Sequence, residues 1–95
     1  MPLFAFIGHD AARGGELRAE VRPAHLAALE HLASRGRIVH AGPMLDEEGC
    51  AVGSVILFEA DDLASARDIA AKDPYVTKGV FARYEVYETR VVFPR

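Results

Sequence analysis

The chain has 95 residues, which fits one compact domain and leaves no room for a second. Its 51% of hydrophobic and 26% of charged residues exclude a disordered chain, and the net charge of −3 lacks the basic character of a nucleic-acid binder. No apolar run reaches the roughly 20 residues that span a bilayer. A single cysteine, Cys50, excludes an internal disulfide and is typical of a reducing compartment. We therefore expect one cytoplasmic domain over residues 1–95 that binds neither nucleic acid nor membrane.

The first third of the chain predicts a strand followed by a long helix. Leu3 to Ile7 is short and apolar, which predicts a strand, and residues 9–16 have the glycines and mixed charge of a polar loop. From Leu17 to Arg35 the apolar residues recur at helical spacing, and Gly36 follows as a C-cap. Pro23 falls inside this pattern, where it either begins the helix proper, with Arg22 before it, or kinks the helix, and we favour a first turn near Arg22.

The rest of the chain alternates in the same way between β-rich and helical patterns. Aspartates and prolines stand where helices should begin, and glycines where strands and helices should end. The expected elements are a strand over Arg37 to Ala41 that Gly42-Pro43 ends, a polar turn over residues 46–49, a strand over Val52 to Ala60, a helix after Asp61 and Asp62, a helical turn over Pro74 to Lys78, and a final strand over Val80 to Val92.

The resulting order, β-α-β-β-α-β, predicts a ferredoxin-like α+β fold, with two helices on one face of a four-stranded antiparallel sheet. Leu3 to Ile7 is apolar on both sides, and so is Val55 to Phe58, although the chain supplies no cover for the second face. Monomers rarely expose an apolar surface of that size. We therefore expect a homodimer through the open sheet face. The alternative is a monomer whose residues 91–93 fold over the sheet.

His25 is the most informative single residue. Val21 and Leu29 lie four residues on either side of it, so its side chain points toward the sheet and not into water. A buried polar group without a partner costs about 1–3 kcal/mol, so the imidazole needs a hydrogen bond. A structural histidine bonded to a backbone carbonyl is an equally good interpretation of the same pattern.

Asp73, in Asp73-Pro74-Tyr75, is the best acidic partner for that imidazole. An aspartate before a proline is a common helix cap, and capping alone explains the residue. The two roles are compatible, because one carboxylate oxygen can cap a helix while the other faces a histidine. Such a pair fixes the histidine tautomer and raises its basicity, as general acid–base catalysis requires.

Two further residues are candidates for substrate binding. Arg22 lies one helical turn before His25 and can hold an anionic group bidentately, although a solvated arginine at a helix start is the simpler interpretation. Ser54 follows Gly53, and a glycine within a strand often marks the close approach of a ligand or of another backbone segment. No base lies near Ser54 in the sequence, so there is little support for Ser54 as a nucleophile. His31 and His40 lack metal-ligand spacing, and no nucleotide motif is present, so we expect no metal and no cofactor.

Several of these residues together resemble the YCII-related proteins. The resemblance follows the chain in order through Arg22-Pro23-Ala24-His25-Leu26, Ala41-Gly42-Pro43, Gly53-Ser54, Asp73-Pro74-Tyr75 and Gly79-Val80-Phe81. It implies a dimeric ferredoxin-like α+β barrel, with His25 and Asp73 as the active-site pair and Arg22 and Ser54 around the same pocket. The family includes a dehydrochlorinase that acts on a chlorinated hydroxyhydroquinone, and most of its members have no assigned reaction.

These observations favour a small enzyme that transfers protons without a cofactor, as lyases and isomerases do. His25 serves as general base or acid, Asp73 orients it, and Arg22 and Ser54 bind a small-molecule substrate. The alternative is a non-catalytic module that binds a small ligand in the same polar pocket. A third interpretation, a contact that only joins the helix to the turn, is disfavoured because an aliphatic side chain would serve without desolvating an imidazole.

Overall fold

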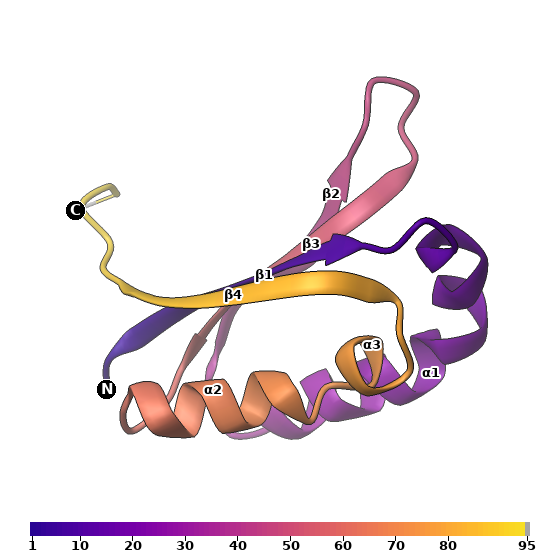
Figure 1. Cartoon of the computed structure of the whole chain (residues 1–95). Helices are drawn as coiled ribbons and strands as arrows, with labels where there is room; N and C mark the ends of the chain where they lie inside the picture. Colours follow the sequence, from indigo (N-terminus) through magenta and orange to yellow (C-terminus); the bar gives the residue numbers. More distant parts are fainter. Residues whose placement is uncertain (95) are drawn as a thin grey trace.

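The computed structural model describes residues 1–94 and contains a single four-stranded sheet with its helices on one face (Figure 1). The strands are all antiparallel and lie in the order β2-β3-β1-β4. This arrangement confirms the predicted ferredoxin-like α+β fold. The elements are β1 (Leu3–Asp10), α1 (Gly14–Ala33), β2 (Ile38–Leu45), β3 (Ala51–Glu59), α2 (Leu63–Ala71), α3 (Pro74–Thr77) and β4 (Phe81–Thr89).

The predicted loop over residues 9–16 is wrong at both of its ends. β1 continues through His9 and Asp10, which pair with β4, and α1 begins at Gly14. A Cβ atom at Gly14 would lie 2.6 Å from the carbonyl oxygen of Val80, so this glycine serves close packing and not a flexible loop. Pro23 lies inside α1 and not at its start, on an exposed side of the helix where water can replace the hydrogen bond that proline cannot make.

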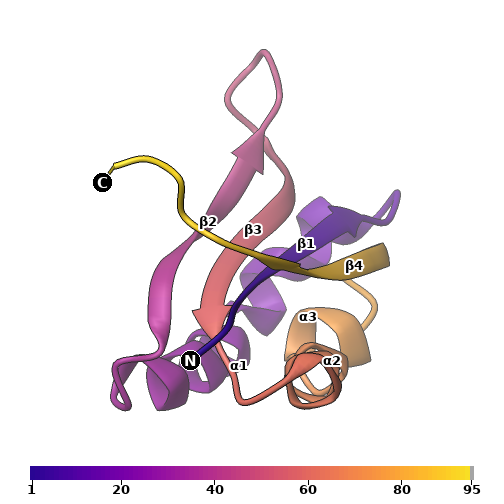
Figure 2. The ribbon, with the colours of Figure 1, turned by 90° about the vertical axis from the view of Figure 1, so that its left-hand side faces the viewer.

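Gly42 and Pro43 do not end the second strand, because β2 runs on to Leu45. Proline is tolerated there because β2 is an edge strand and makes sheet hydrogen bonds on one side only. The predicted turn after β2 is confirmed: Asp46 accepts hydrogen bonds from the backbone N–H groups of Glu48 and Cys50. The β2–β3 hairpin that carries this turn projects well beyond the other two strands, β1 and β4 (Figure 2).

The helix starts in the second half of the chain follow the expected capping. Asp62 caps α2 by accepting a hydrogen bond of 2.7 Å from the backbone N–H of Ser65, and this bond lowers the pKa of the Asp62 carboxyl. Asp73 caps α3, whose first residue is Pro74. Gly79 has a φ of 79° just after α3, a left-handed conformation that favours glycine. The last strand, β4, is shorter than expected and ends at Thr89.

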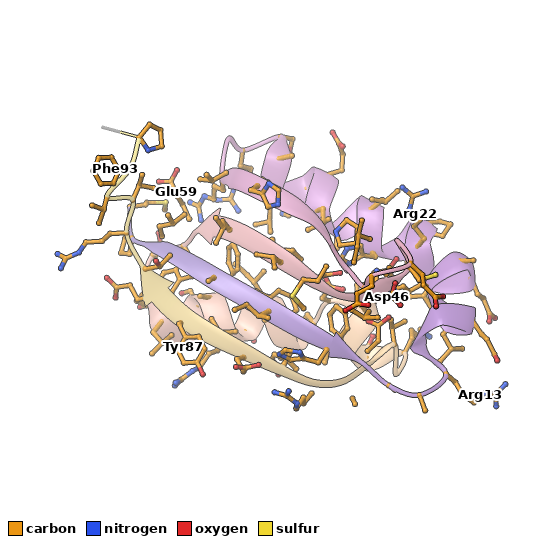
Figure 3. The ribbon with its side chains drawn as sticks, turned by 90° about the horizontal axis from the view of Figure 1, so that it is seen from above. Arg13, Arg22, Asp46, Glu59, Tyr87 and Phe93 are labelled. Atoms are coloured by element: carbon orange, nitrogen blue, oxygen red, sulfur yellow. The ribbon has the colours of Figure 1, made fainter. Side chains whose placement is uncertain are left out.

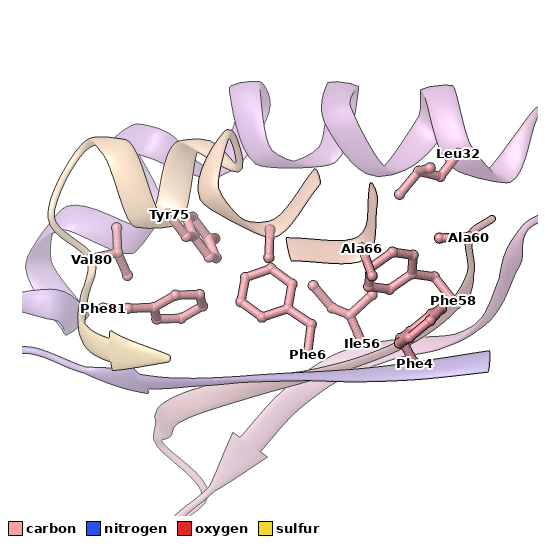
Figure 4. Close-up of a cluster of buried hydrophobic side chains, with 11 residues drawn as sticks. Phe4, Phe6, Leu32, Ile56, Phe58, Ala60, Ala66, Tyr75, Val80 and Phe81 are labelled. Atoms are coloured by element: carbon pink, nitrogen blue, oxygen red, sulfur yellow. The ribbon is translucent and has the colours of Figure 1, made fainter. Parts of the chain in front are cut away.

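The hydrophobic core fills the space between the sheet and the helices (Figure 4). Alternate residues of β1 and β3 point toward the helices, as the two-residue period of a strand requires. The packing includes an edge-to-face contact between Tyr75 and Phe81, whose ring centroids are 5.6 Å apart. The buried hydrophobic residues are Phe4, Phe6, Leu32, Ile56, Phe58, Ala60, Ala66, Ala70, Tyr75, Val80 and Phe81.

The opposite face of the sheet is not covered by any helix (Figure 1). Leu3, Ala5 and Ile7 of β1 alternate with the core residues, and in the sheet they lie beside Val55 and Leu57 of β3. Residues 91–93 extend past the end of the sheet, and their side chains are exposed (Figure 3). The tail therefore does not cover this face, contrary to the monomer alternative. No helix within residues 1–94 has the length and apolar character that crossing a bilayer requires.

Candidate active site

His25 is buried on the inner face of α1, with 6% of its surface exposed, as its helical spacing predicts. Its Nδ1 atom lies 2.8 Å from Oδ1 and 3.0 Å from Oδ2 of Asp73. The imidazole also stacks on the ring of Tyr75, with centroids 3.8 Å apart and an angle of 4° between the planes. Stacking and hydrogen bonding together fix both the plane of the ring and its rotation.

Asp73 caps α3 and contacts His25 at the same time. Its Oδ1 atom accepts a hydrogen bond of 2.8 Å from the backbone N–H of Tyr75, and it is buried like His25. An ionised carboxylate only accepts hydrogen bonds, so Nδ1 of the imidazole is the donor. The neutral ring then carries its proton on Nδ1 and keeps a lone pair on Nε2.

His25 lines a cleft, and solvent reaches its Nε2 atom. Within residues 1–94, no buried side-chain nitrogen or oxygen lacks a hydrogen-bond partner. Nε2 has no partner there, so solvent must reach it. The cleft has a volume of about 350 Å³ and lies between α1 and the β2–β3 hairpin. Its walls are formed by Arg18, Ala19, Arg22, His25, Leu26, Leu29, Ala41, Gly42, Pro43, Ala51, Ser54, Ile56 and Tyr75.

Both residues predicted to bind substrate line this cleft. Arg22 is exposed on α1 (Figure 3), and it has no ion-pair or hydrogen-bond partner in the part of the chain that the structure describes. Ser54 is buried in β3, where its Oγ atom accepts a hydrogen bond of 3.0 Å from Nη2 of Arg18. The structure therefore brings His25, Arg22 and Ser54 to one cavity, with Asp73 behind the imidazole.

Two polar residues of the site were not predicted. Arg18 donates hydrogen bonds of 2.7 and 2.9 Å to the two carboxylate oxygens of Asp10. Arg18 stands four residues before Arg22 and seven before His25, a spacing that places all three on one helix face. That spacing is the signal that reveals Arg18. Asp10 was assigned to an exposed loop, and only the extended β1 brings it here.

The charge of the cleft favours an anionic or electron-rich ligand. Arg18, Arg22 and His25 line it, and among residues 1–94 no carboxylate side chain forms part of its walls. Because Asp10 balances the charge of Arg18, Arg22 is, among the cleft residues that the structure describes, the cation available to a ligand. The other walls are mainly apolar, as is typical of sites for small organic molecules.

Other polar groups lie away from the cleft. His9 is on the open face of the sheet, where its Nε2 atom is 2.6 Å from Oε1 of Glu85. Cys50 is an exposed free thiol next to the turn of the β2–β3 hairpin. Within residues 1–94, no three side chains of the metal-ligating types come close enough together to hold a metal ion.

Burial raises the pKa of the Tyr75 hydroxyl above its ordinary value, and the positive charges of Arg18 and Arg22 offset part of the rise. The pKa of Tyr75 is therefore higher in the folded protein than in the unfolded chain, where it is about 10. The neutral hydroxyl contributes its full stability below the unfolded pKa, and this contribution is lost as the pH rises through the pKa of the folded state. We therefore expect an alkaline unfolding step that the Tyr75→Phe variant lacks. Circular dichroism between about pH 9 and pH 12 measures it, and an identical profile for both proteins would contradict the assignment.

Comparisons with known proteins identify the family of this chain and agree with its fold. A model of the YCII-related domain matches residues 2–90. The protein YciI of Escherichia coli O6:H1 is 38% identical over 97 residues, which cover 96% of this chain and 99% of that protein. An uncharacterized protein of Haemophilus influenzae is 34% identical over 95% of this chain and 98% of its own length. The chain therefore belongs to the YCII-related family.

Solved structures extend these similarities. The 5-chloro-2-hydroxyhydroquinone dehydrochlorinase (TftG) of Burkholderia phenoliruptrix AC1100, in complex with 2,5-dihydroxybenzoquinone, has a TM-score of 0.81 and 27% identity, and the match covers 93% of each chain. A dimeric ferredoxin-like protein from an uncultured marine organism matches over the full length of both chains with a TM-score of 0.57. At 20% identity, the second similarity supports the fold alone.

Proposed function

We propose that this protein is a cytoplasmic enzyme that performs cofactor-free acid–base chemistry, of the lyase or isomerase type, on a small anionic or phenolic molecule. One observation carries the proposal. The Nδ1 atom of His25 is held 2.8 Å from a buried carboxylate, while solvent reaches its Nε2 atom and the residue lines a cleft of about 350 Å³. A histidine that only joined two elements would have no need of an open second nitrogen.

In the proposed mechanism, Nε2 of His25 removes a proton from the bound substrate and later returns it or releases it to water. Asp73 keeps the proton of the neutral ring on Nδ1, which leaves the lone pair of Nε2 directed at the cleft. When the ring takes up a second proton, the adjacent carboxylate stabilises the imidazolium. The helix cap on α3 holds Asp73 in place throughout.

The proposed substrate is a small ring compound with acidic or carbonyl oxygens. Arg22 holds a negatively charged oxygen, and Ser54 contacts another polar atom. The similarity to the dehydrochlorinase supports this class. Dehydrochlorination removes one proton and one chloride ion from the substrate with no net change of oxidation state. The reaction therefore needs a base that accepts the proton and needs no oxidant or reductant.

The test uses the purified protein with 5-chloro-2-hydroxyhydroquinone as the substrate. We expect chloride release faster than the rate in buffer alone, followed with a chloride-sensitive probe. Binding of 2,5-dihydroxybenzoquinone, measured separately by calorimetry, distinguishes the alternative function. A protein that binds this quinone without releasing chloride from the substrate would instead be a ligand-binding module for this class of molecule.

We also propose that two copies associate through the open sheet face. Its apolar residues, which include Ile7, Val55 and Leu57, are only partly buried, and no helix of residues 1–94 covers this face (Figure 1). Covering such a face with a second sheet buries it from water, which favours association by roughly 25 cal/mol for each Å² of apolar surface. A solved protein that shares this fold is itself dimeric.

Light scattering at micromolar concentration should give twice the mass of one chain. Leu57→Lys places a charge in the middle of the open face and should yield a folded monomer, because burying an unpaired ammonium opposes association. Ala27→Lys, on the exposed side of α1, is the control and should remain a dimer. A wild-type protein with the mass of one chain would remove the dimer from this account.

A further inference from the structure

A buried polar cluster of Asp10, Arg18 and Ser54 lies beside the cleft but outside the His25–Asp73 pair. The guanidinium of Arg18 donates to both oxygens of Asp10, and Nη2 also donates to Oγ of Ser54 at 3.0 Å. Only 13% of the Arg18 side chain and 8% of the Asp10 side chain are exposed. The cluster joins α1, β1 and β3 at one end of the cleft.

The hydrogen bond from Arg18 determines which way the Ser54 hydroxyl can act. A guanidinium has only donors, so in this contact the Oγ atom must be the acceptor. A serine hydroxyl also carries one proton of its own. That proton has no acceptor in residues 1–94, and Ser54 lines the cleft. Ser54 is therefore prepared to donate a hydrogen bond into the cleft.

Arg18 is held in this position from several sides. Its bidentate contact with Asp10 fixes the plane of the guanidinium. The same group lies 5.1 Å from the centroid of the Tyr75 ring and 5.9 Å from that of Phe81. Tyr75 in turn stacks on His25, so the orientation of Arg18 is tied to that of the imidazole.

We propose that Arg18, fixed by Asp10, is a positioning residue that orients the Ser54 hydroxyl as a hydrogen-bond donor to a carbonyl or phenolate oxygen of the ligand. This inference rests on the proposed function, because it assigns the contact of a second ligand oxygen in the same cleft. Asp10 balances the charge of Arg18, so Arg18 acts through Ser54 and leaves the binding of negative charge to Arg22. The ligand thus needs an oxygen acceptor near Ser54 and its exchangeable proton near Nε2 of His25.

A double-mutant cycle tests this assignment, with 2,5-dihydroxybenzoquinone as the probe and calorimetry as the measurement. Arg18→Lys keeps the positive charge but loses the planar guanidinium, whose several N–H groups contact Asp10 and Ser54 at the same time. We expect Arg18→Lys and Ser54→Ala each to weaken binding about tenfold, and the double variant to show about the same tenfold loss. Arg67→Lys, on the exposed side of α2, is the matched control and should bind like the wild type.

A merely structural Arg18 would give a different pattern. Ser54→Ala with wild-type affinity, or a double variant in which the two losses multiply to about a hundredfold, would overturn the inference. If Arg18→Lys does not fold, Asp10→Asn, which loosens the hold on the same guanidinium, takes its place in the cycle with Ser54→Ala. Wild-type binding with the expected cycle but no chloride release would reject the proposed chemistry and keep this inference. Failure of the wild type to bind the quinone at millimolar concentration would reject both.

Discussion

Replacing His25 by glutamine is expected to lower the rate of chloride release by about 10²–10⁴-fold, the usual contribution of a general acid or base. Glutamine has a similar size, and its amide can donate to Asp73 in place of Nδ1. It has no titratable nitrogen to present to the cleft, so proton transfer is lost while the cleft keeps its shape. Affinity for 2,5-dihydroxybenzoquinone should therefore change little in the same variant.

Two further variants at histidine positions make this result specific. His31→Gln is the matched control, because His31 is exposed on the same helix and does not line the cleft. It should release chloride at the wild-type rate. His25→Leu should also be inactive, and it should be less stable than His25→Gln because it leaves the buried Asp73 carboxylate without its imidazole donor. Wild-type turnover by His25→Gln would exclude His25 as the proton-transfer group, whatever the stability of the variants.

Replacing Asp73 by alanine is expected to destabilise the protein by about 2–4 kcal/mol, the combined cost of an unpaired buried hydrogen-bond donor and of a lost helix cap. The change leaves the imidazole of His25 without its acceptor and α3 without its cap. Urea unfolding followed by circular dichroism measures the free energy of unfolding. Asp62→Ala is the control, since Asp62 is an exposed cap with no histidine partner, and its effect should be much smaller.

Asp73→Asn separates the two roles of this residue. Asparagine is as good a helix cap as aspartate, so most of the stability should return. Its neutral amide cannot stabilise an imidazolium as the carboxylate does, so turnover should stay low. An Asp73→Ala variant that loses no more stability than Asp62→Ala would show that the buried contact with His25 contributes little to folding.

The inward position of His25 was predictable because helical spacing alone decides which face a residue occupies. Val21 and Leu29 mark that face, and their pattern does not depend on where the helix begins. The capping role of Asp73 was predictable for a similar reason, since a cap contacts a backbone N–H only two residues ahead. Its contact with His25, 48 residues away, depends on how α1 packs against α3. The local sequence pattern could only indicate Asp73 as the best acidic candidate for that contact.

Arg18 and Asp10 show where local patterns give the wrong answer. Gly14 and Gly15 indicate a loop by composition, but close packing against Val80 requires glycine at position 14 within a helix. Without that packing contact, the start of α1 and the end of β1 are both misplaced. Asp10 reaches Arg18 only because β1 extends beside β4, and strand pairing of that kind depends on residues far away in the sequence.

The most direct test of the account is the tautomer of His25 and its response to ligand. A long-range ¹H–¹⁵N correlation spectrum of protein labelled at histidine shows which ring nitrogen carries the proton in the neutral form, and His25→Gln assigns the signal. The account predicts a proton on Nδ1 and a selective shift of Nε2 when 2,5-dihydroxybenzoquinone is added. A proton on Nε2, or a quinone that binds without changing the Nε2 signal, would contradict it.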